Sequence, residues 1–229
     1  DHRYIHSFPT RRSSDLICKS DCKLEFIVFN DFSRDETKNL LIQSQQKWGF
    51  RLIHLEDITN TLSPNYKLVL QMAQKQALEK QIPLIIVESD VIIEPDTIRR
   101  LLEITKGLQK PGLVGAITID SKGNYNFPYN FEKVKSSRTI NTMHSLSFCC
   151  TLLTLPFLQT YNFTELPQQK DWYDVSISRQ SRKSGFQNYL AKGVEVLHLP
   201  HSSRPWKNLK YSNPILYYLK KFLNKRDRI

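Results

Sequence analysis

Glycine is scarce in this chain, with only seven among 229 residues. Neither GxGxxG nor GxxxxGK[ST] is present, which excludes the glycine-rich phosphate loops of dinucleotide-binding and P-loop proteins. No apolar run reaches about 18 residues, so we expect no membrane-spanning helix. The four cysteines form neither a CxxC pair nor a metal spacing with the histidines, a pattern typical of reduced thiols in a cytoplasmic protein.

Basic residues outnumber acidic ones, 33 to 22, giving a formal charge of +11. Such a balance indicates nucleic acid, an anionic membrane surface or phosphate-bearing substrates as partners, or simply a basic surface. No basic helix with paired zinc ligands and no aromatic RNP strand is present, so we predict no nucleic-acid partner. With 40% hydrophobic and 24% charged residues, the chain suits a single globular core.

The first sixteen residues read unlike the rest of the chain. Residues 6–16, HSFPTRRSSDL, are what a common sequencing-library adapter encodes when it is translated. We therefore expect residues 1–16 to be non-native, the natural gene to begin upstream, and a first strand before Cys22 to be missing. Like a tag or a fusion scar, the segment is excluded from fold reasoning.

Strands and helices alternate along the chain. The sequence predicts strands over 24–29, 51–55, 84–87, 113–119, 187–190 and 194–199, and a buried run over 146–155 that leads into a helix near Pro156. It predicts helices from a capping box at 33–36 to about Lys47, over 65–80, after Asp96, and after Asp174 as far as Gly185. This order indicates an α/β domain, over 17–203, with a mainly parallel central sheet and flanking helices.

Two carboxylates follow the predicted strand at 84–87, in the sequence Glu88-Ser89-Asp90. An all-apolar, β-branched strand is typically buried on both faces, and open α/β sheets place ligands beyond the carboxyl ends of such strands. Two oxygen ligands there suit a hard cation, Mg²⁺ or Mn²⁺, that also holds a diphosphate. The alternative is an acidic turn that binds no metal.

Three motifs in this order resemble the family 2 glycosyltransferases of the GT-A fold. NDFSRDET corresponds to the family's VDDGSxDxT-like turn, Glu88-Ser89-Asp90 to its DxD-like motif, and Tyr173-Asp174 with Arg179 and Gly185 to its EDxDxxxRxxxxG element. The resemblance covers residues 24–201. The chain departs from the family at Asn30 and Glu88, where aspartate is usual, and at Tyr173, where glutamate is usual.

The resemblance implies transfer of a sugar from a nucleotide-diphosphate sugar, with inversion and with a divalent cation. By correspondence, Asp31, Ser33 and Glu88 would contact the donor, and Asp90, Glu88 and a late histidine, His198, would hold the cation. An inverting transfer needs a base for the acceptor hydroxyl. We expect this base to be Asp174, with Asp171 as the second choice.

Each of these residues also has a structural alternative. Asp31 can form an Asx turn, Asp174 can cap its helix, and a strand-end histidine such as His198 or His201 is often structural. The substitutions at Glu88 and Tyr173 leave open a non-catalytic, basic module that binds membranes or polyanions. A nucleotidyltransferase, which shares strand-end carboxylates, is a third reading that the late Asp-helix-Gly element disfavours.

The C-terminal segment 204–229 interleaves aromatic residues with lysine and arginine. Such a segment can lie on an anionic membrane interface, or it can form an amphipathic helix packed on the domain. We expect a cytoplasmic protein, with peripheral contact at the inner face of the membrane as an option. At the inner face of the membrane, the acceptor of the sugar would be a glycan or a lipid-linked molecule, as in polysaccharide biosynthesis.

Overall fold

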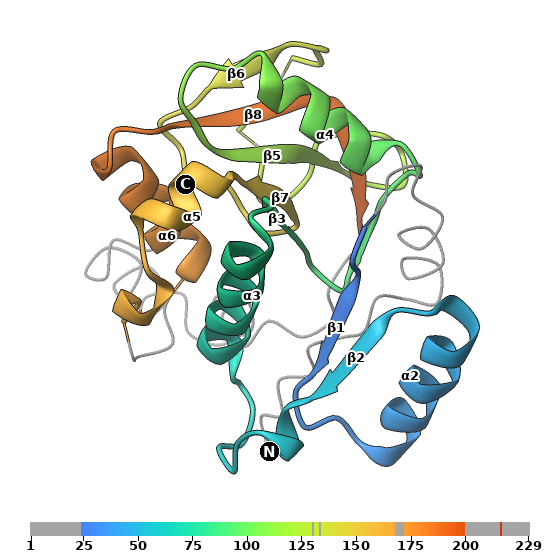
Figure 1. Cartoon of the computed structure of the whole chain (residues 1–229). Helices are drawn as coiled ribbons and strands as arrows, with labels where there is room; N and C mark the ends of the chain where they lie inside the picture. The colour runs from blue at the N-terminus through green and yellow to red at the C-terminus, as the bar shows by residue number, and fades with distance from the viewer. Residues whose placement is uncertain (1–23, 130, 133, 168–171, 200–215, 217–229) are drawn as a thin grey trace.

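The computed structural model describes residues 24–129, 131–132, 134–167, 172–199 and 216. The helices are α2 (Asp35–Trp48), α3 (Tyr66–Lys80), α4 (Thr97–Lys106), α5 (Leu155–Thr160) and α6 (Tyr173–Lys183), with short 3-10 turns at Leu55–Asp57 and Phe163–Glu165 (Figure 1). The strands are β1 (Ile27–Asn30), β2 (Arg51–His54), β3 (Leu84–Val87), β4 (Val91–Ile92), β5 (Pro111–Ile119), β6 (Thr139–Asn141), β7 (Cys150–Leu153) and β8 (Gln187–His198). The predicted segments 1–16 and 204–229 lie outside the described residues, apart from Leu216.

The central sheet has the strand order β3-β7-β5-β8-β4, and β6 pairs with β8 as well. β1 and β2 form a separate two-stranded parallel sheet. The α/β class with a central sheet and flanking helices is therefore confirmed. The sheet is not wholly parallel, because β5–β8 is its parallel pair whereas β3–β7, β5–β7, β4–β8 and β6–β8 are antiparallel.

The antiparallel pairs of β7 have a physical cause in the connection between β5 and β7. Parallel neighbours need a crossover, usually a helix, on one face of the sheet. Between residues 120 and 149, the residues that the structure describes (120–129, 131–132 and 134–149) form turns, loops and the short strand β6. β7 therefore enters between β3 and β5 running in the opposite direction.

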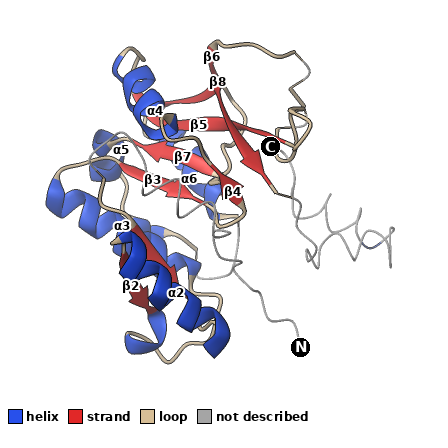
Figure 2. Cartoon of the chain, turned by 90° about the vertical axis from the view of Figure 1, so that its right-hand side faces the viewer, coloured by secondary structure: helices blue, strands red, loops and turns tan. Residues whose placement is uncertain are grey.

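Alternating side chains of the central strands fill two hydrophobic clusters, one on each face of the sheet. Leu113 and Leu153 pack with residues of α3, α5 and α6. Their neighbours Val114 and Leu152 pack with α4. Figures 1 and 2 accordingly show α4 on the opposite side of β5 and β8 from α3 and α5. Burial on both faces explains why these strands read as continuous apolar runs.

Helix ends follow the sequence in part. Gly49 and Gly185, after α2 and α6, have φ of 71° and 82°, the left-handed conformation that glycine adopts at helix ends without strain. The predicted capping box is wrong: α2 has Arg34 as its N-cap residue and no side-chain cap. The amide of Ser33 instead donates to Asn30 Oδ1 at 3.3 Å. Asp96 is the N-cap residue of α4 as predicted, but its side chain caps no amide.

β8 replaces the two short strands predicted over 187–190 and 194–199. It pairs in parallel with β5, and the register of this pair shifts once: Ala116 faces Ala191, whereas the next residue, Ile117, faces Glu195. The extra residues 192–194 form a bulge. Lys192 of the bulge makes a 2.7 Å ion pair with Glu132, and both side chains are largely buried. Within the part of the chain that the structure describes, no helix is both long and apolar enough to cross a membrane.

Candidate active site

The acidic tripeptide lies where β3 ends. The Glu88 amide donates to the Cys149 carbonyl at 3.1 Å, and Val91 donates back to the Glu88 carbonyl at 3.2 Å, which closes a tight turn. β4 then pairs with the end of β8, with Val91 opposite His198. This pairing brings Asp90 beside His198, although the two residues are distant in sequence.

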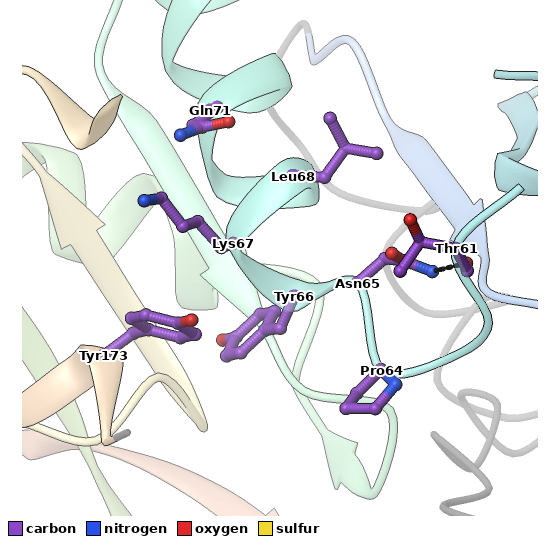
Figure 3. A pocket seen from close by; sticks show the side chains of 8 residues that line it. All are labelled: Thr61, Pro64, Asn65, Tyr66, Lys67, Leu68, Gln71 and Tyr173. Carbon is purple, nitrogen blue, oxygen red and sulfur yellow. Dashed lines mark hydrogen bonds between the residues drawn. The ribbon is translucent and has the colours of Figure 1, made fainter. Parts of the chain in front are cut away.

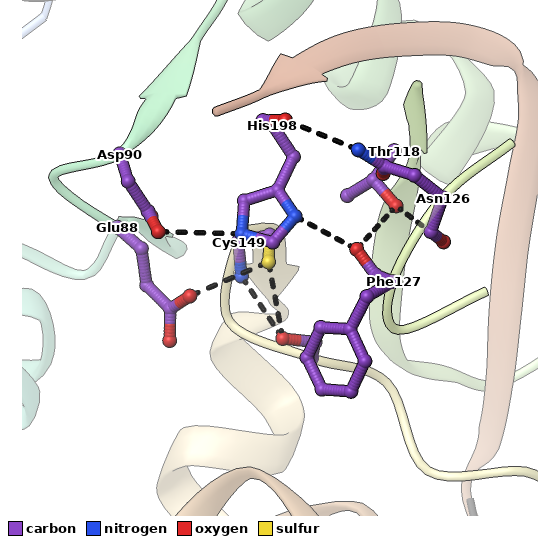
Figure 4. A network of polar contacts seen from close by, with 8 residues as sticks. Glu88, Asp90, Thr118, Asn126, Phe127, Cys149 and His198 are labelled. Carbon is purple, nitrogen blue, oxygen red and sulfur yellow. Dashed lines mark hydrogen bonds and ion pairs between the residues drawn. The ribbon is translucent and has the colours of Figure 1, made fainter. Parts of the chain in front are cut away.

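Asp90 and His198 form a buried pair, with side chains 8% and 4% exposed and 3.3 Å between Oδ2 and Nε2. On the other side of the ring, Nδ1 lies 2.8 Å from the carbonyl oxygen of Phe127 (Figure 4). A carbonyl oxygen only accepts, so Nδ1 carries the hydrogen. His198 therefore presents Nε2 to the carboxylate of Asp90.

Glu88 lies beside this pair in an acidic environment. Burial and, after it, the carboxylates of Asp90 and Asp174 together raise the pKa of Glu88 to about 7, while a hydrogen bond from Cys149 and the charge of His198 oppose the shift. That bond runs from Cys149 Sγ to Glu88 Oε2 over 3.3 Å. Burial also raises the pKa of the Cys149 thiol well above its usual range, so the thiol is a donor here and not a nucleophile.

Asp174 stands in the first turn of α6 and is half-buried. Its Oδ1 accepts from the amide of Val175 at 2.8 Å. The negative charge of Asp174 contributes to raising the pKa of Glu88. It also contributes to raising the pKa of Tyr66, where burial and the charge of Glu88 are the larger causes. The structure thus places Asp174 near the strand-end carboxylates. Asp171 and His201 lie outside the described residues.

Asp31 follows β1 and is held by another part of the chain. Its carboxylate accepts from Ser63 Oγ at 2.9 Å, from the Asn65 amide at 2.8 Å and from Asn65 Nδ2 at 2.8 Å. These bonds tie the end of β1 to the loop that precedes α3, rather than forming an Asx turn. A carboxylate has about four lone-pair positions, so Asp31 retains room for one further donor.

A pocket lies between the N-terminal ends of α3 and α6 (Figure 3). Tyr66 and Tyr173 meet there edge to face, with ring centroids 6.0 Å apart. The remaining lining residues are Thr61, Pro64, Asn65, Lys67, Leu68 and Gln71. The pocket adjoins both Asp31, through Asn65, and the acidic site, through Tyr66. Aromatic faces with amide and ammonium groups suit a sugar or a nucleotide.

The Asp90–His198 pair fits two ligands of a hard divalent cation. Adjacent ligands at about 2.1 Å from an octahedral ion are about 3.0 Å apart, close to the observed 3.3 Å. The bond from Nδ1 to a carbonyl is the outer contact that metal-binding histidines usually have. Within the described ranges, no three His, Cys, Asp or Glu residues form a metal-holding group. Protein ligands from those residues would therefore need completion by phosphate oxygens and water.

Several residues of this site were missed by sequence reasoning. In the sequence, Cys149 indicates only a reduced thiol, and Phe127, whose carbonyl meets the ring of His198, carries no signal. Cys149 lies opposite Glu88 because β7 is antiparallel to β3, with Val87 facing Cys150. A correct register for β7 was the one signal that could have found it.

Fold and site together define an α/β protein with carboxylates at the carboxyl end of β3, the first strand in the order of the central sheet. The sequence profile described as glycosyl transferase family 2 matches residues 11–159. The chain belongs to this family. No curated protein matches the sequence.

Solved structures share the fold, which is the GT-A fold. Residues 1–349 of S. aureus TarS align with a TM-score of 0.58 at 14% identity, over 84% of this chain and 58% of that one. The mannosyltransferase PcManGT from Pyrobaculum calidifontis, in complex with GDP-Man and Mn²⁺, gives 0.60 and 14%, over 92% and 59%. GalNAc-T7 with UDP, GalNAc and Mn²⁺ gives 0.56 and 13%, over 80% and 40%. The chain spans less than two thirds of each of these proteins.

Proposed function

We propose that this protein transfers a sugar from a nucleotide-diphosphate sugar to a hydroxyl group of a glycan or lipid-linked acceptor, with inversion at the anomeric carbon. The observation that carries the proposal is the buried Asp90–His198 pair at the end of β3, with Glu88 beside it. Membership of glycosyl transferase family 2 supports the reaction class. Mn²⁺ in two structural neighbours supports the choice of cation.

Asp90 and His198 would hold Mg²⁺ or Mn²⁺, and the cation would neutralise the donor's diphosphate as it leaves. The role of Glu88 is then different from that of Asp90. Its pKa of about 7 and its bond to Cys149 favour contact with the donor over a ligand position. A partly protonated carboxyl group can donate to a sugar or phosphate oxygen, which a carboxylate cannot do.

Asp174 would take the proton of the acceptor hydroxyl. Its position in the first turn of α6 places a carboxylate near Glu88 but on a different element. An inverting transfer needs base and leaving group on opposite faces of the sugar, and Asp174 would supply the base from an element other than the strands that carry Asp90 and His198. Asp171 keeps its place as the second candidate.

The donor's nucleoside would lie against the end of β1 and the pocket between α3 and α6. Asp31 and Ser33 would contact it, with Asp31 using its remaining lone-pair position. The basic composition of the chain, +11 overall, supports a phosphate-bearing donor and peripheral contact with an anionic membrane at its cytoplasmic face.

The test is donor binding and turnover with UDP-, GDP- and dTDP-sugars, with Mn²⁺ or with a chelator. Metal-dependent binding in the wild type, lost in Asp90→Ala and in His198→Ala, is the expected outcome. Asp96→Ala is the matched control, because Asp96 is an acidic residue close by on the exposed start of α4. Binding of anionic vesicles without binding of any donor would favour the non-catalytic module instead.

The stereochemistry needs a separate measurement. Proton NMR of the first product formed gives the configuration at the anomeric carbon. We expect it to be opposite to that of the donor, and retention would reject Asp174 as the sole base.

A further inference from the structure

A short hairpin that follows β5 contacts His198 on the side of the ring opposite Asp90. Asp120 closes the turn of this hairpin by accepting from the amides of Lys122 and Asn124 at 2.8 and 2.9 Å. The returning residues place the Phe127 carbonyl 2.8 Å from His198 Nδ1, and Asn126 Nδ2 donates to the His198 carbonyl at 3.1 Å. The ring and the backbone of His198 are thus both fixed by the same two residues.

Thr118 contacts this arrangement from the end of β5. Its side chain is fully buried, and its hydroxyl lies 3.0 Å from the Phe127 carbonyl oxygen and 3.3 Å from that of Asn126 (Figure 4). A hydroxyl group has one hydrogen, and the shorter contact marks Phe127 as its main acceptor. The Phe127 carbonyl therefore accepts two hydrogen bonds, one from Thr118 and one from His198.

This arrangement decides which nitrogen of His198 faces Asp90. A neutral imidazole carries its hydrogen on one nitrogen only, and the hydrogen bond at the other nitrogen selects the tautomer. With the hydrogen on Nδ1, the lone pair of Nε2 points at the carboxylate 3.3 Å away. Two acceptors so placed need a cation or a proton between them. With the opposite tautomer, Nε2 would donate to Asp90 and exclude a metal ion.

We propose that Thr118 is a positioning residue for His198, because its hydroxyl aims the Phe127 carbonyl at Nδ1, so that the hydrogen is on Nδ1 and the lone pair of Nε2, beside Asp90, can bind a divalent cation together with that carboxylate. This inference rests on the proposed function for the cation, but the tautomer can be measured without it. Thr118 itself contacts neither donor nor metal.

The experiment combines histidine nitrogen NMR with Mn²⁺ binding on the full chain. Thr118→Val removes the hydroxyl and keeps the branched shape, while Thr118→Ser keeps the hydroxyl. Thr154→Val is the matched control, because Thr154 is also buried and donates to a backbone carbonyl, that of Pro111, at 2.7 Å. His198 signals are assigned by their loss in His198→Gln.

We expect Nδ1 to carry the hydrogen in the wild type, Thr118→Ser and Thr154→Val, and to lose it in part in Thr118→Val. Mn²⁺ affinity, measured by electron paramagnetic resonance, should fall about tenfold in Thr118→Val alone, the lower end for an outer contact of a metal ligand.

A bare Nδ1 in the wild type would overturn the proposal even if Thr118→Val does not fold. Unchanged tautomer and Mn²⁺ affinity in a folded Thr118→Val would also overturn it. If the wild type binds no Mn²⁺, the cation in the proposed function fails, and the tautomer shift alone decides the role of Thr118.

Discussion

Two aspartates follow strands of this protein, and their surroundings differ. Asp31, after β1, accepts three hydrogen bonds from Ser63 and Asn65, so the protein itself satisfies most of its carboxylate. Asp90, after β3, faces the ring nitrogen of His198 at 3.3 Å. A strand-end aspartate can therefore fix a loop, as Asp31 does, or face a ring nitrogen across a buried site, as Asp90 does, and the residues opposite it decide which. Variants at the two positions should therefore affect different properties.

The largest effect is expected for Asp90→Asn. Loss of one carboxylate ligand removes charge stabilisation worth several kcal/mol, so turnover should fall on the order of 10³-fold. Steady-state kinetics with saturating Mn²⁺ provide the measurement. Asp96→Asn should keep wild-type kinetics, and wild-type turnover in Asp90→Asn would reject the metal role.

Asp174→Asn should lower turnover by about 10²–10⁴-fold, the usual contribution of a positioned base. Donor binding should remain, because Asp174 acts on the acceptor, and a binding titration beside the kinetics separates the two. Asp35→Asn is the control, since Asp35 also lies in the first turn of a helix but is exposed. Loss of donor binding equal to the loss of rate would contradict a base.

Asp31→Ala should act on stability, in contrast to Asp90→Asn. It leaves the donors of Asn65, a buried residue, without their acceptor, which costs about 1–3 kcal/mol. Urea unfolding gives the free energy of unfolding. Asp57→Ala is the control, because Asp57 is an exposed acid in the 3-10 turn at Leu55–Asp57, and it should change the free energy of unfolding little. A stable Asp31→Ala with weakened donor binding would show that the nucleoside contact dominates.

The smallest effect is expected for Cys149→Ala, which removes the donor to Glu88. One net hydrogen bond of about 1 kcal/mol corresponds to roughly a fivefold loss in kcat/KM. Cys149→Ser keeps a donor and should retain most activity. Cys150→Ala is the neighbouring control, a buried thiol at the first residue of β7. Equal losses in Cys149→Ala and Cys150→Ala would assign the effect to packing.

Local patterns predicted the elements of this fold, and contacts across the sheet account for what they missed. The glycines at 49 and 185 each indicated the helix end found. The apolar run at 84–87 indicated a strand correctly, but its expected burial on both faces is wrong: β3 is the first strand in the order of the central sheet, and its four residues are only half-buried. The capping box failed because the Ser33 amide is bound by Asn30, an acceptor outside the motif. In the site, the spacing of Glu88 and Asp90 after an apolar run identified both as candidates. The contact between Asp90 and His198 could not be predicted in this way, because it depends on the pairing of β4 with β8.

The direction of β7 was the main feature that the sequence left undetermined. An apolar run does not encode whether a strand is parallel or antiparallel, since both faces are buried in either case. Cys149 reaches Glu88 only through that direction. The hydrogen bonds of Asp31 could not be predicted from the sequence either, because its partners Ser63 and Asn65 belong to a loop with no periodic pattern.

The bulge in β8 makes chain length in that strand a determinant of the contact between His198 and Asp90. Strand side chains alternate between the two faces, so the number of residues between Ala191 and His198 sets the face on which the imidazole emerges. Removing one residue from 192–194 would turn His198 away from Asp90 while leaving the composition of the site unchanged. Single-residue deletions or insertions between 191 and 198 should therefore separate His198 from Asp90 even though every residue of the site is still present.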